Sequence, residues 1–325
     1  MSFRKRLLAG LALTLGLGSL AVSAAQAQDA PSLKGKRIGI TVAGTEHYWD
    51  LKAYQGQIDE VKRLGGIPIA LDAGRNDSRQ IAQIQTLIAQ KPDAIVEQLG
   101  SAPVLQPWLK KIRAAGIPLF TVDTISPYSI NDTTSDNYSI GEKLALQLAS
   151  DIKGRGNILV FNGFYSVPVC AIRYDELKLV LRAFPDIHII QPELRDVIPN
   201  TVQNAYSQVT DMLQKYPNKG DIAAIWSAWD VPQVGATQAV LAAHRTEVRT
   251  YGVDGSPDVV KMVADPASPA SAVAAQQPYL IGKTAIDTVA RYLAGDHDLP
   301  PYTFLPAILV NKQNAADAAK ALGQS

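Results

Sequence analysis

Aromatic and hydrogen-bonding side chains gather directly after the first apolar run of the chain. The run RIGITVA at residues 37–43 is soon followed by Glu46, His47, Tyr48, Trp49 and Asp50. A turn between a strand and a helix usually carries Gly, Asn, Asp or Ser. Rings pack on the C–H faces of a sugar or polyol, and carboxylates and amides bond its hydroxyls. These residue types indicate one wall of a ligand site, although Trp49 alone fits core packing equally well.

Residues of the same kinds close the later apolar runs. Ligands of an open parallel sheet bind beyond the carboxyl ends of its strands, so these closing residues are the informative ones. Those after the first run are Gln98, Asp123, Phe164, Trp229 with Asp230, Asp254 and Gln276. Asp123 and Asp254 could each merely cap a turn or a helix. Their shared place with rings and amides favours a ligand crevice.

The elements that must position these residues alternate along the chain. Apolar runs of four to seven residues, rich in Ile, Val, Leu and Ala, are bounded by Gly, Pro or Asp, which is typical of strands buried on both faces of a parallel sheet. Between them, the 3.6-residue period predicts helices near 51–64, 78–90, 104–115, 140–152, 174–184, 202–216, 234–244 and 280–293.

This alternation restarts after the polar stretch SPYSINDTTSDNYS at residues 126–139. Two successive strand–helix series predict an α/β protein made of two doubly wound parallel-sheet lobes. An eight-fold β/α barrel is the alternative that length alone allows.

The first 28 residues have the design of a cleaved signal peptide. Arg4, Lys5 and Arg6 precede an apolar run at 7–22, and small residues follow. The alternative is a membrane-spanning helix, but the run is shorter than the roughly 20 residues that a bilayer needs and holds three glycines. We therefore expect export to the periplasm.

Composition narrows the possible functions. The chain has 31 Lys and Arg against 30 Asp and Glu, and without the three basic signal residues the counts are 28 and 30, a net charge of −2. A nearly neutral chain without a basic run offers no surface for nucleic acid. Cys170, the only cysteine, is interpreted as a small apolar group rather than a nucleophile. The four histidines lack metal-ligand spacing, so we expect no metal and no cofactor.

Other functional classes are disfavoured by missing motifs. A hydrolase elbow, a phosphate loop and an acid/base pair at a strand end are all absent from the sequence, so we do not expect an enzyme. A sugar-responsive repressor would carry a helix-turn-helix where this chain carries its export signal. A receptor for a flat-ringed ligand, such as a nucleoside or a signalling molecule, stays open because the same rings could sandwich it.

Six motifs in order resemble the type I periplasmic solute-binding proteins of ABC transporters, in the ribose/galactose-binding group. They are DAGRNDSRQIAQIQTLIAQKPDAIV (72–96), AAGIPLFTVD (114–123), TSDNYSIGEKLA (134–145), NILVFNG (157–163), YGVDGSPDVVKMV (251–263) and AAQQPYLIGKTAID (274–287). The resemblance implies a non-catalytic, monomeric receptor. It would capture a monosaccharide or sugar alcohol by hinge closure and pass it to an inner-membrane ABC permease.

The resemblance also implies a division of the chain and a set of contacts. An N-terminal lobe would comprise 33–135 plus 277–305, and a C-terminal lobe 136–276 plus 306–325. The implied contacts are Tyr48, Trp49, Gln98, Asp123, Ser135 or its neighbour Asn137, Phe164, Arg173, Asp254 and Gln276; His47 and Trp229 join them from the strand ends. Thr124 and Trp229–Asp230 depart from the ribose-type pattern, which implies a different arrangement of ligand hydroxyls.

Overall fold

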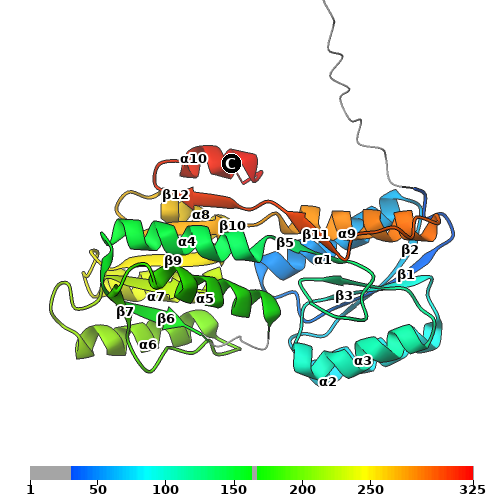
Figure 1. Cartoon of the computed structure of the whole chain (residues 1–325), viewed down its shortest axis with the longest axis horizontal. Helices are drawn as coiled ribbons and strands as arrows, with labels where there is room; N and C mark the ends of the chain where they lie inside the picture. The colour runs from blue at the N-terminus through cyan, green and yellow to red at the C-terminus, as the bar shows by residue number, and fades with distance from the viewer. Residues whose placement is uncertain (1–30, 163–166, 325) are drawn as a thin grey trace, which may run out of the picture.

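The computed structural model describes residues 31–162 and 167–324, so the expected signal peptide lies outside the described residues. Its strands form two six-stranded sheets that lie side by side along the long axis of the molecule (Figure 1). We call each sheet with its covering helices a lobe, the N-lobe and the C-lobe. The predicted α/β fold of two doubly wound lobes is confirmed, and the barrel alternative is wrong.

The N-lobe is a parallel sheet between two pairs of helices. Its elements are β1 (Arg37–Val42), α1 (Tyr48–Arg63), β2 (Ile67–Asp72), α2 (Asp77–Gln90), β3 (Ala94–Gln98), α3 (Ala102–Ala114), β4 (Leu119–Val122), β5 (Asp132–Ser135), α9 (Pro278–Leu293) and β11 (Tyr302–Leu305). The strand order is β11-β5-β4-β3-β1-β2. Side chains alternate between the faces: Val96 packs toward α1 and α9, and its neighbour Ile95 toward α2 and α3.

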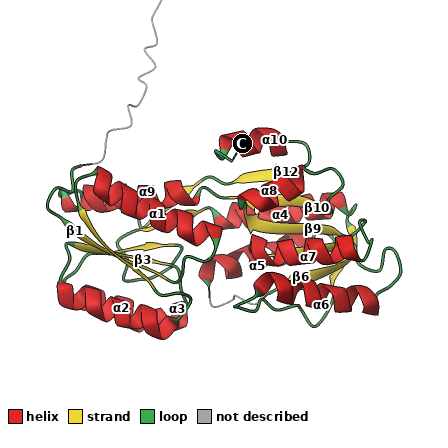
Figure 2. Ribbon diagram, turned by 180° about the vertical axis from the view of Figure 1, so that it is seen from behind, coloured by secondary structure: helices red, strands yellow, loops and turns green. Residues whose placement is uncertain are grey.

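Two glycines let α1 and α9 approach closely. A Cβ added to Gly56 would lie 2.2 Å from the Tyr279 carbonyl oxygen, and one added to Gly282 would lie 2.0 Å from that of Ala53. Neither position tolerates a side chain without a shift of the backbone. The two helices lie side by side on one face of the sheet (Figures 1 and 2), and α1 begins directly after the first strand–helix turn of the chain.

The C-lobe repeats the arrangement with one antiparallel edge. Its elements are α4 (Asn137–Asp151), β6 (Arg155–Phe161), α5 (Pro168–Leu181), β7 (Asp186–Ile189), α6 (Thr201–Lys215), β8 (Ala224–Ser227), α7 (Asp230–Ala242), β9 (Arg249–Asp254), α8 (Pro257–Ala264), β10 (Ala270–Ala275), β12 (Ile308–Asn311) and α10 (Ala315–Ala321). The order is β12-β10-β9-β8-β6-β7, and β12 runs antiparallel to β10. Helices α4 and α5 cover one face, and α6 and α7 the other.

The chain passes between the lobes three times: from β5 to α4, from β10 to α9, and from β11 to β12. Each passage is short, since one to two residues separate the paired elements. Among the described residues, the helices are all too short or too polar to cross a membrane.

Candidate functional site

A cavity lies between the lobes, at the carboxyl ends of strands from both sheets. Its empty volume, counted together with the open solvent at its mouth, is about 460 Å³. The N-lobe lines it with His47, Trp49, Asp50, Arg75, Leu99 and Asp123, and the C-lobe with Val167, Val169, Cys170, Arg173, Trp229 and Asp254. Because both lobes contribute to the wall, this inner cavity exists only while the lobes are in contact.

Four of the lining residues have a backbone that is unusual for residues other than glycine. The φ angles are 57° at Arg75, 56° at Leu99, 54° at Asp123 and 102° at Asp254. Each residue lies at or just beyond the end of its strand. Such conformations cost on the order of 1–3 kcal/mol each and gather at functional sites, where they aim side chains that regular strands would not.

Arg173 is the buried cation of the inner cavity, with 2% of the residue exposed. Its Nε donates to Asn137 Oδ1 at 2.7 Å, and its Nη1 donates to the Ala228 carbonyl at 2.8 Å and approaches Asp254 Oδ1 at 3.4 Å. Gln276 also donates to Asp254 Oδ1, at 2.7 Å. Burial raises the pKa of Asp254, and Arg173 and His47 offset only part of that rise.

Asp123 lies on the N-lobe side of the cavity and is 2% exposed. It accepts a hydrogen bond from the Thr134 hydroxyl. Burial raises the pKa of Asp123 to about 7, although the positive charge of Arg173 acts in the opposite direction. Its carboxyl group therefore gains from any hydroxyl that donates to it, because such a bond stabilises the ionised form.

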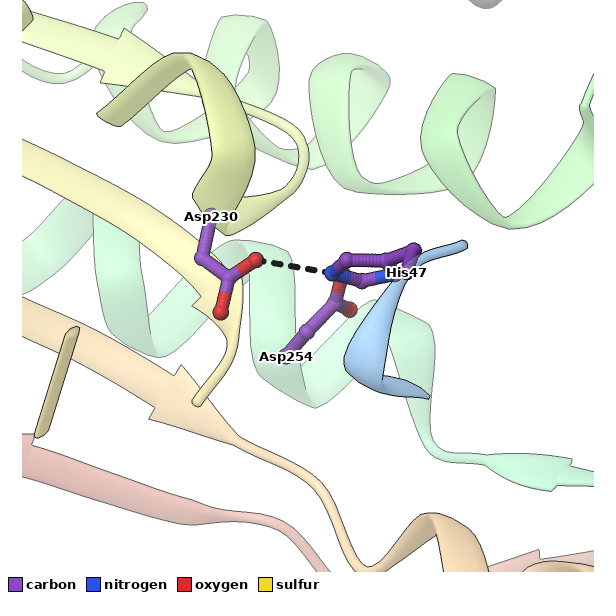
Figure 3. Close-up of side chains that lie close together, drawn as sticks. All are labelled: His47, Asp230 and Asp254. Carbon is purple, nitrogen blue, oxygen red and sulfur yellow. Dashed lines mark hydrogen bonds and ion pairs between the residues drawn. The ribbon is translucent and has the colours of Figure 1, made fainter. Parts of the chain in front are cut away.

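His47 connects the two lobes. Its Nε2 lies 3.0 Å from Asp230 Oδ1 and 3.8 Å from Asp254 Oδ2 (Figure 3). Burial lowers the pKa of His47, but the hydrogen bond and charge of Asp230, with the charge of Asp254, outweigh it and raise the pKa overall. Burial acts against ionised Asp230, yet the contacts with His47 keep the pKa of Asp230 below its usual value.

The atoms of His47, Asp230 and Asp254 lie within 4.8 Å of one another and could hold a metal ion. Their existing partners already balance their charges, because Arg173 pairs with Asp254 and His47 with Asp230. The backbone N–H of Ser256 donates to the other oxygen of Asp230 at 2.8 Å. The three side chains therefore form a contact between the lobes in which each charged group already has a partner.

The structure brings six of the predicted site residues to the inner cavity: His47, Trp49, Asp123, Arg173, Trp229 and Asp254. Of the others, Gln98, Asn137 and Gln276 lie buried behind the lining. Gln98 donates to the Asp50 carbonyl at 2.9 Å, while Asn137 and Gln276 hold Arg173 and Asp254.

Three further predicted residues lie elsewhere. Ser135 is buried, and its Oγ has no hydrogen-bond partner among the described residues. Tyr48 is absent from the lining of the inner cavity, and its hydroxyl accepts a 3.4 Å hydrogen bond from Gln324. Phe164 lies outside the described residues.

Sequence reasoning missed an ion pair at the cavity wall. Arg75 bonds the buried carboxylate of Asp50, and both side chains line the cavity. The sequence does contain a signal for Arg75, because this residue follows the second strand by three residues and so lies beyond a strand end, like Gln98 and Asp123. Cys170 also lines the cavity, and burial raises the pKa of its thiol to about 12.

Two α/β lobes that enclose a small-molecule cavity define a two-lobed solute-binding protein. A family model described as "Periplasmic binding protein domain" matches residues 38–297, and the chain belongs to this family. The resemblance drawn from the sequence motifs is thereby confirmed.

Solved structures of related proteins are similar over most of the chain. An ABC sugar transporter subunit from Rhodobacter sphaeroides is 70% identical, with a TM-score of 0.86, and the alignment covers 87% of this chain and 100% of that one. An ABC transporter solute-binding protein from Agrobacterium vitis, with bound allitol, is 62% identical, with a TM-score of 0.88 and coverage of 90% and 100%. The xylitol-binding protein of Mycolicibacterium smegmatis is 26% identical, with coverage of 77% and 70%.

Proposed function

We propose that this chain is the solute-binding component of an ABC importer and captures a sugar alcohol or a monosaccharide between its lobes. The observation that carries the proposal is the inner cavity, which described residues of both lobes line. A ligand that contacts both lobes favours their closed arrangement by its differential affinity. The related structure with bound allitol supports an acyclic polyol as the ligand class.

The lining can satisfy a polyol in three ways. Asp123 and Asp254 can accept hydrogen bonds from hydroxyls, and Arg173 can donate to them. The rings of Trp49 and Trp229 can pack on C–H groups. The indole N–H of Trp49 is buried without a partner among the described residues, so it is a further donor for a bound hydroxyl. Asn137 and Gln276 would act by holding Arg173 and Asp254 in place.

The proposal also covers the location, oligomeric state and partner of such a receptor. We propose that the chain is exported to the periplasm, works as a monomer, presents its closed form to an inner-membrane permease and catalyses no reaction. The hinge would lie in the three passages between the lobes, which divides the chain as the sequence predicts. The relatives, which are described as binding proteins and transporter subunits, support this context.

Isothermal titration calorimetry tests the ligand class. The panel comprises allitol, xylitol, ribitol, ribose, galactose and, as a flat-ringed ligand, adenosine. We expect at least one polyol or monosaccharide to bind with a micromolar or lower Kd. Binding to none of these carbohydrates would overturn the proposal, and tighter binding of adenosine would replace it with the flat-ringed alternative.

A matched pair of arginine variants tests the site. Arg173→Ala leaves Asn137, the Ala228 carbonyl and Asp254 without a buried donor, so we expect it to weaken binding by about 2 kcal/mol or more, roughly 30-fold in Kd. Arg182 ends the same helix at an exposed position, and Arg182→Ala should bind like the native chain. Equal affinities in the two variants would refute the site.

A further inference from the structure

A second hollow adjoins the inner cavity. This outer groove has about 1820 Å³ of empty space and is lined by both lobes. Three residues line the inner cavity and the outer groove alike: His47, Arg75 and Trp229. These side chains therefore form the partition between the two spaces.

The partition is held from both sides. The rings of His47 and Trp229, one from each lobe, meet edge to face with centroids 5.3 Å apart and an interplanar angle of 86°. His47 bonds Asp230 across the lobes, and Trp229 Nε1 donates to Asp196 Oδ1 at 3.1 Å. Arg75 is fixed by its ion pair with Asp50. Each member thus has a partner that keeps it in place without a ligand.

The outer groove has a lining suited to further hydroxyl groups. Side chains of Asn200, Gln203, Ser256 and Asp258 border it, and Ile198 and Val231 add apolar surface. Polar groups beside apolar ones are the combination that a second sugar or polyol unit would need. A ligand with a substituent at one end could therefore use both spaces, if the rings of His47 and Trp229 let it pass.

We propose that the His47–Trp229 pair sets ligand size: it restricts the inner cavity to one unsubstituted polyol or monosaccharide and rejects the same unit with a substituent at its end. The inference rests on the proposed function and adds its size limit. A terminal substituent would have to part the two rings and break the His47–Asp230 contact that joins the lobes. Removing either ring would merge the inner cavity with the outer groove.

The test compares one polyol with its substituted form. Allitol and 1-O-benzylallitol, or the tightest-binding polyol of the panel and its benzyl ether, are titrated by calorimetry into the native chain and into Trp229→Ala and His47→Ala. We expect the native chain to bind the ether about 30-fold or more weakly than the parent polyol. In each variant that ratio should shrink to about threefold, whatever happens to the affinity for the parent.

Matched controls separate this effect from a general loss of structure. Trp108→Ala and His188→Ala remove a tryptophan and a histidine that border neither the inner cavity nor the outer groove, and both should keep the native ratio. Circular dichroism and thermal unfolding establish whether each variant is folded. If Trp229→Ala does not fold, His47→Ala alone tests the proposal.

Each outcome decides between the two proposals. A native chain that binds the ether as well as the parent, or folded variants that keep the native ratio, would overturn the size limit and leave the proposed function intact. A native chain that binds no carbohydrate of the panel would overturn both.

Discussion

At the scale of single residues, the inner cavity combines buried charge with strained backbone. Asp123 and Asp254 are buried carboxylates whose φ angles lie in the left-handed region. Both features cost stability, and such costs are retained where function requires them. The strand-end rule predicted both carboxylates because it depends only on residue type and place. It could not predict their backbone angles, since Asp is compatible with several conformations at a turn.

Substitution of Asp123 should raise the stability of the chain and weaken its ligand binding. Because burial raises its pKa to about 7, the carboxyl group contributes most to stability below its usual pKa of 3.8, and that contribution is lost as the pH rises through about 7. Asn cannot ionise and can still accept from Thr134. The stability of Asp123→Asn relative to the native chain should therefore increase from about pH 4.5 to about pH 7.5, by on the order of 2–4 kcal/mol. The variant should also bind polyols more weakly.

Urea unfolding at the two pH values measures the gain. Asp186→Asn, at an exposed position on β7, is the matched control for the same change of residue type. An Asp123→Asn variant whose difference from the native chain is the same at pH 4.5 and 7.5 would contradict the buried-carboxyl account.

At the scale of elements, periodicity predicted most helices and failed at some ends. The predicted segment 78–90 corresponds to α2, which begins one residue earlier. The segment predicted near 174–184 begins at Pro168 instead, because proline at the first turn extends the helix toward the cavity. Strands β11 and β12 were not predicted, since each has four residues and is partly exposed. Strand β11 pairs with β5 in the N-lobe and β12 with β10 in the C-lobe, and both partners are distant in sequence.

The contact between α1 and α9 offers a test in which helix propensity and packing have opposite signs. Replacing glycine by alanine inside a helix normally stabilises it by roughly 0.5–1 kcal/mol. Gly56→Ala and Gly282→Ala should each destabilise the chain instead, by about 1–3 kcal/mol, because the new Cβ would lie within 2.2 Å of a backbone oxygen.

The double variant supplies the internal control for this contact. Once one alanine has pushed the helices apart, the second meets less resistance, so the double variant should cost less than the sum of the single ones. Urea unfolding of the four proteins gives the cycle. A stabilising effect of either alanine would show that the helices do not pack this closely.

At the scale of the whole molecule, the site is a property of the closed pair of lobes. The sequence predicted two lobes from the restart of the strand–helix alternation, and the family resemblance supplied the hinge. The sequence could not predict that His47 contacts Asp230, which lies 183 residues away in the other lobe. Contacts of this kind depend on how two separately formed sheets come together. Local sequence patterns do not predict the relative placement of the two sheets.

Closure should therefore take up a proton at His47. Between the closed lobes, burial lowers the pKa of His47 and Arg75 acts with it, but Asp230 and Asp254 raise the pKa above its usual 6.5. Opening would separate His47 from both carboxylates and return the pKa toward that usual value. The contact is thus strongest below about pH 6.5 and is lost as the pH rises through the raised value.

The contribution of His47 to polyol affinity should accordingly weaken as the pH rises from about 6 to 8.5, and calorimetry across this range on the native chain and a His47 variant measures it. His47→Gln, which keeps a hydrogen-bonding side chain but cannot be protonated, should remove this part of the pH dependence. Asp123 titrates in the same range, so the decisive quantity is the difference in slope between His47→Gln and the control His188→Gln at an exposed position. Parallel slopes would mean that the lobes close without help from the His47 charge, and the Asp230 contact would then be a consequence of closure rather than a contributor to it.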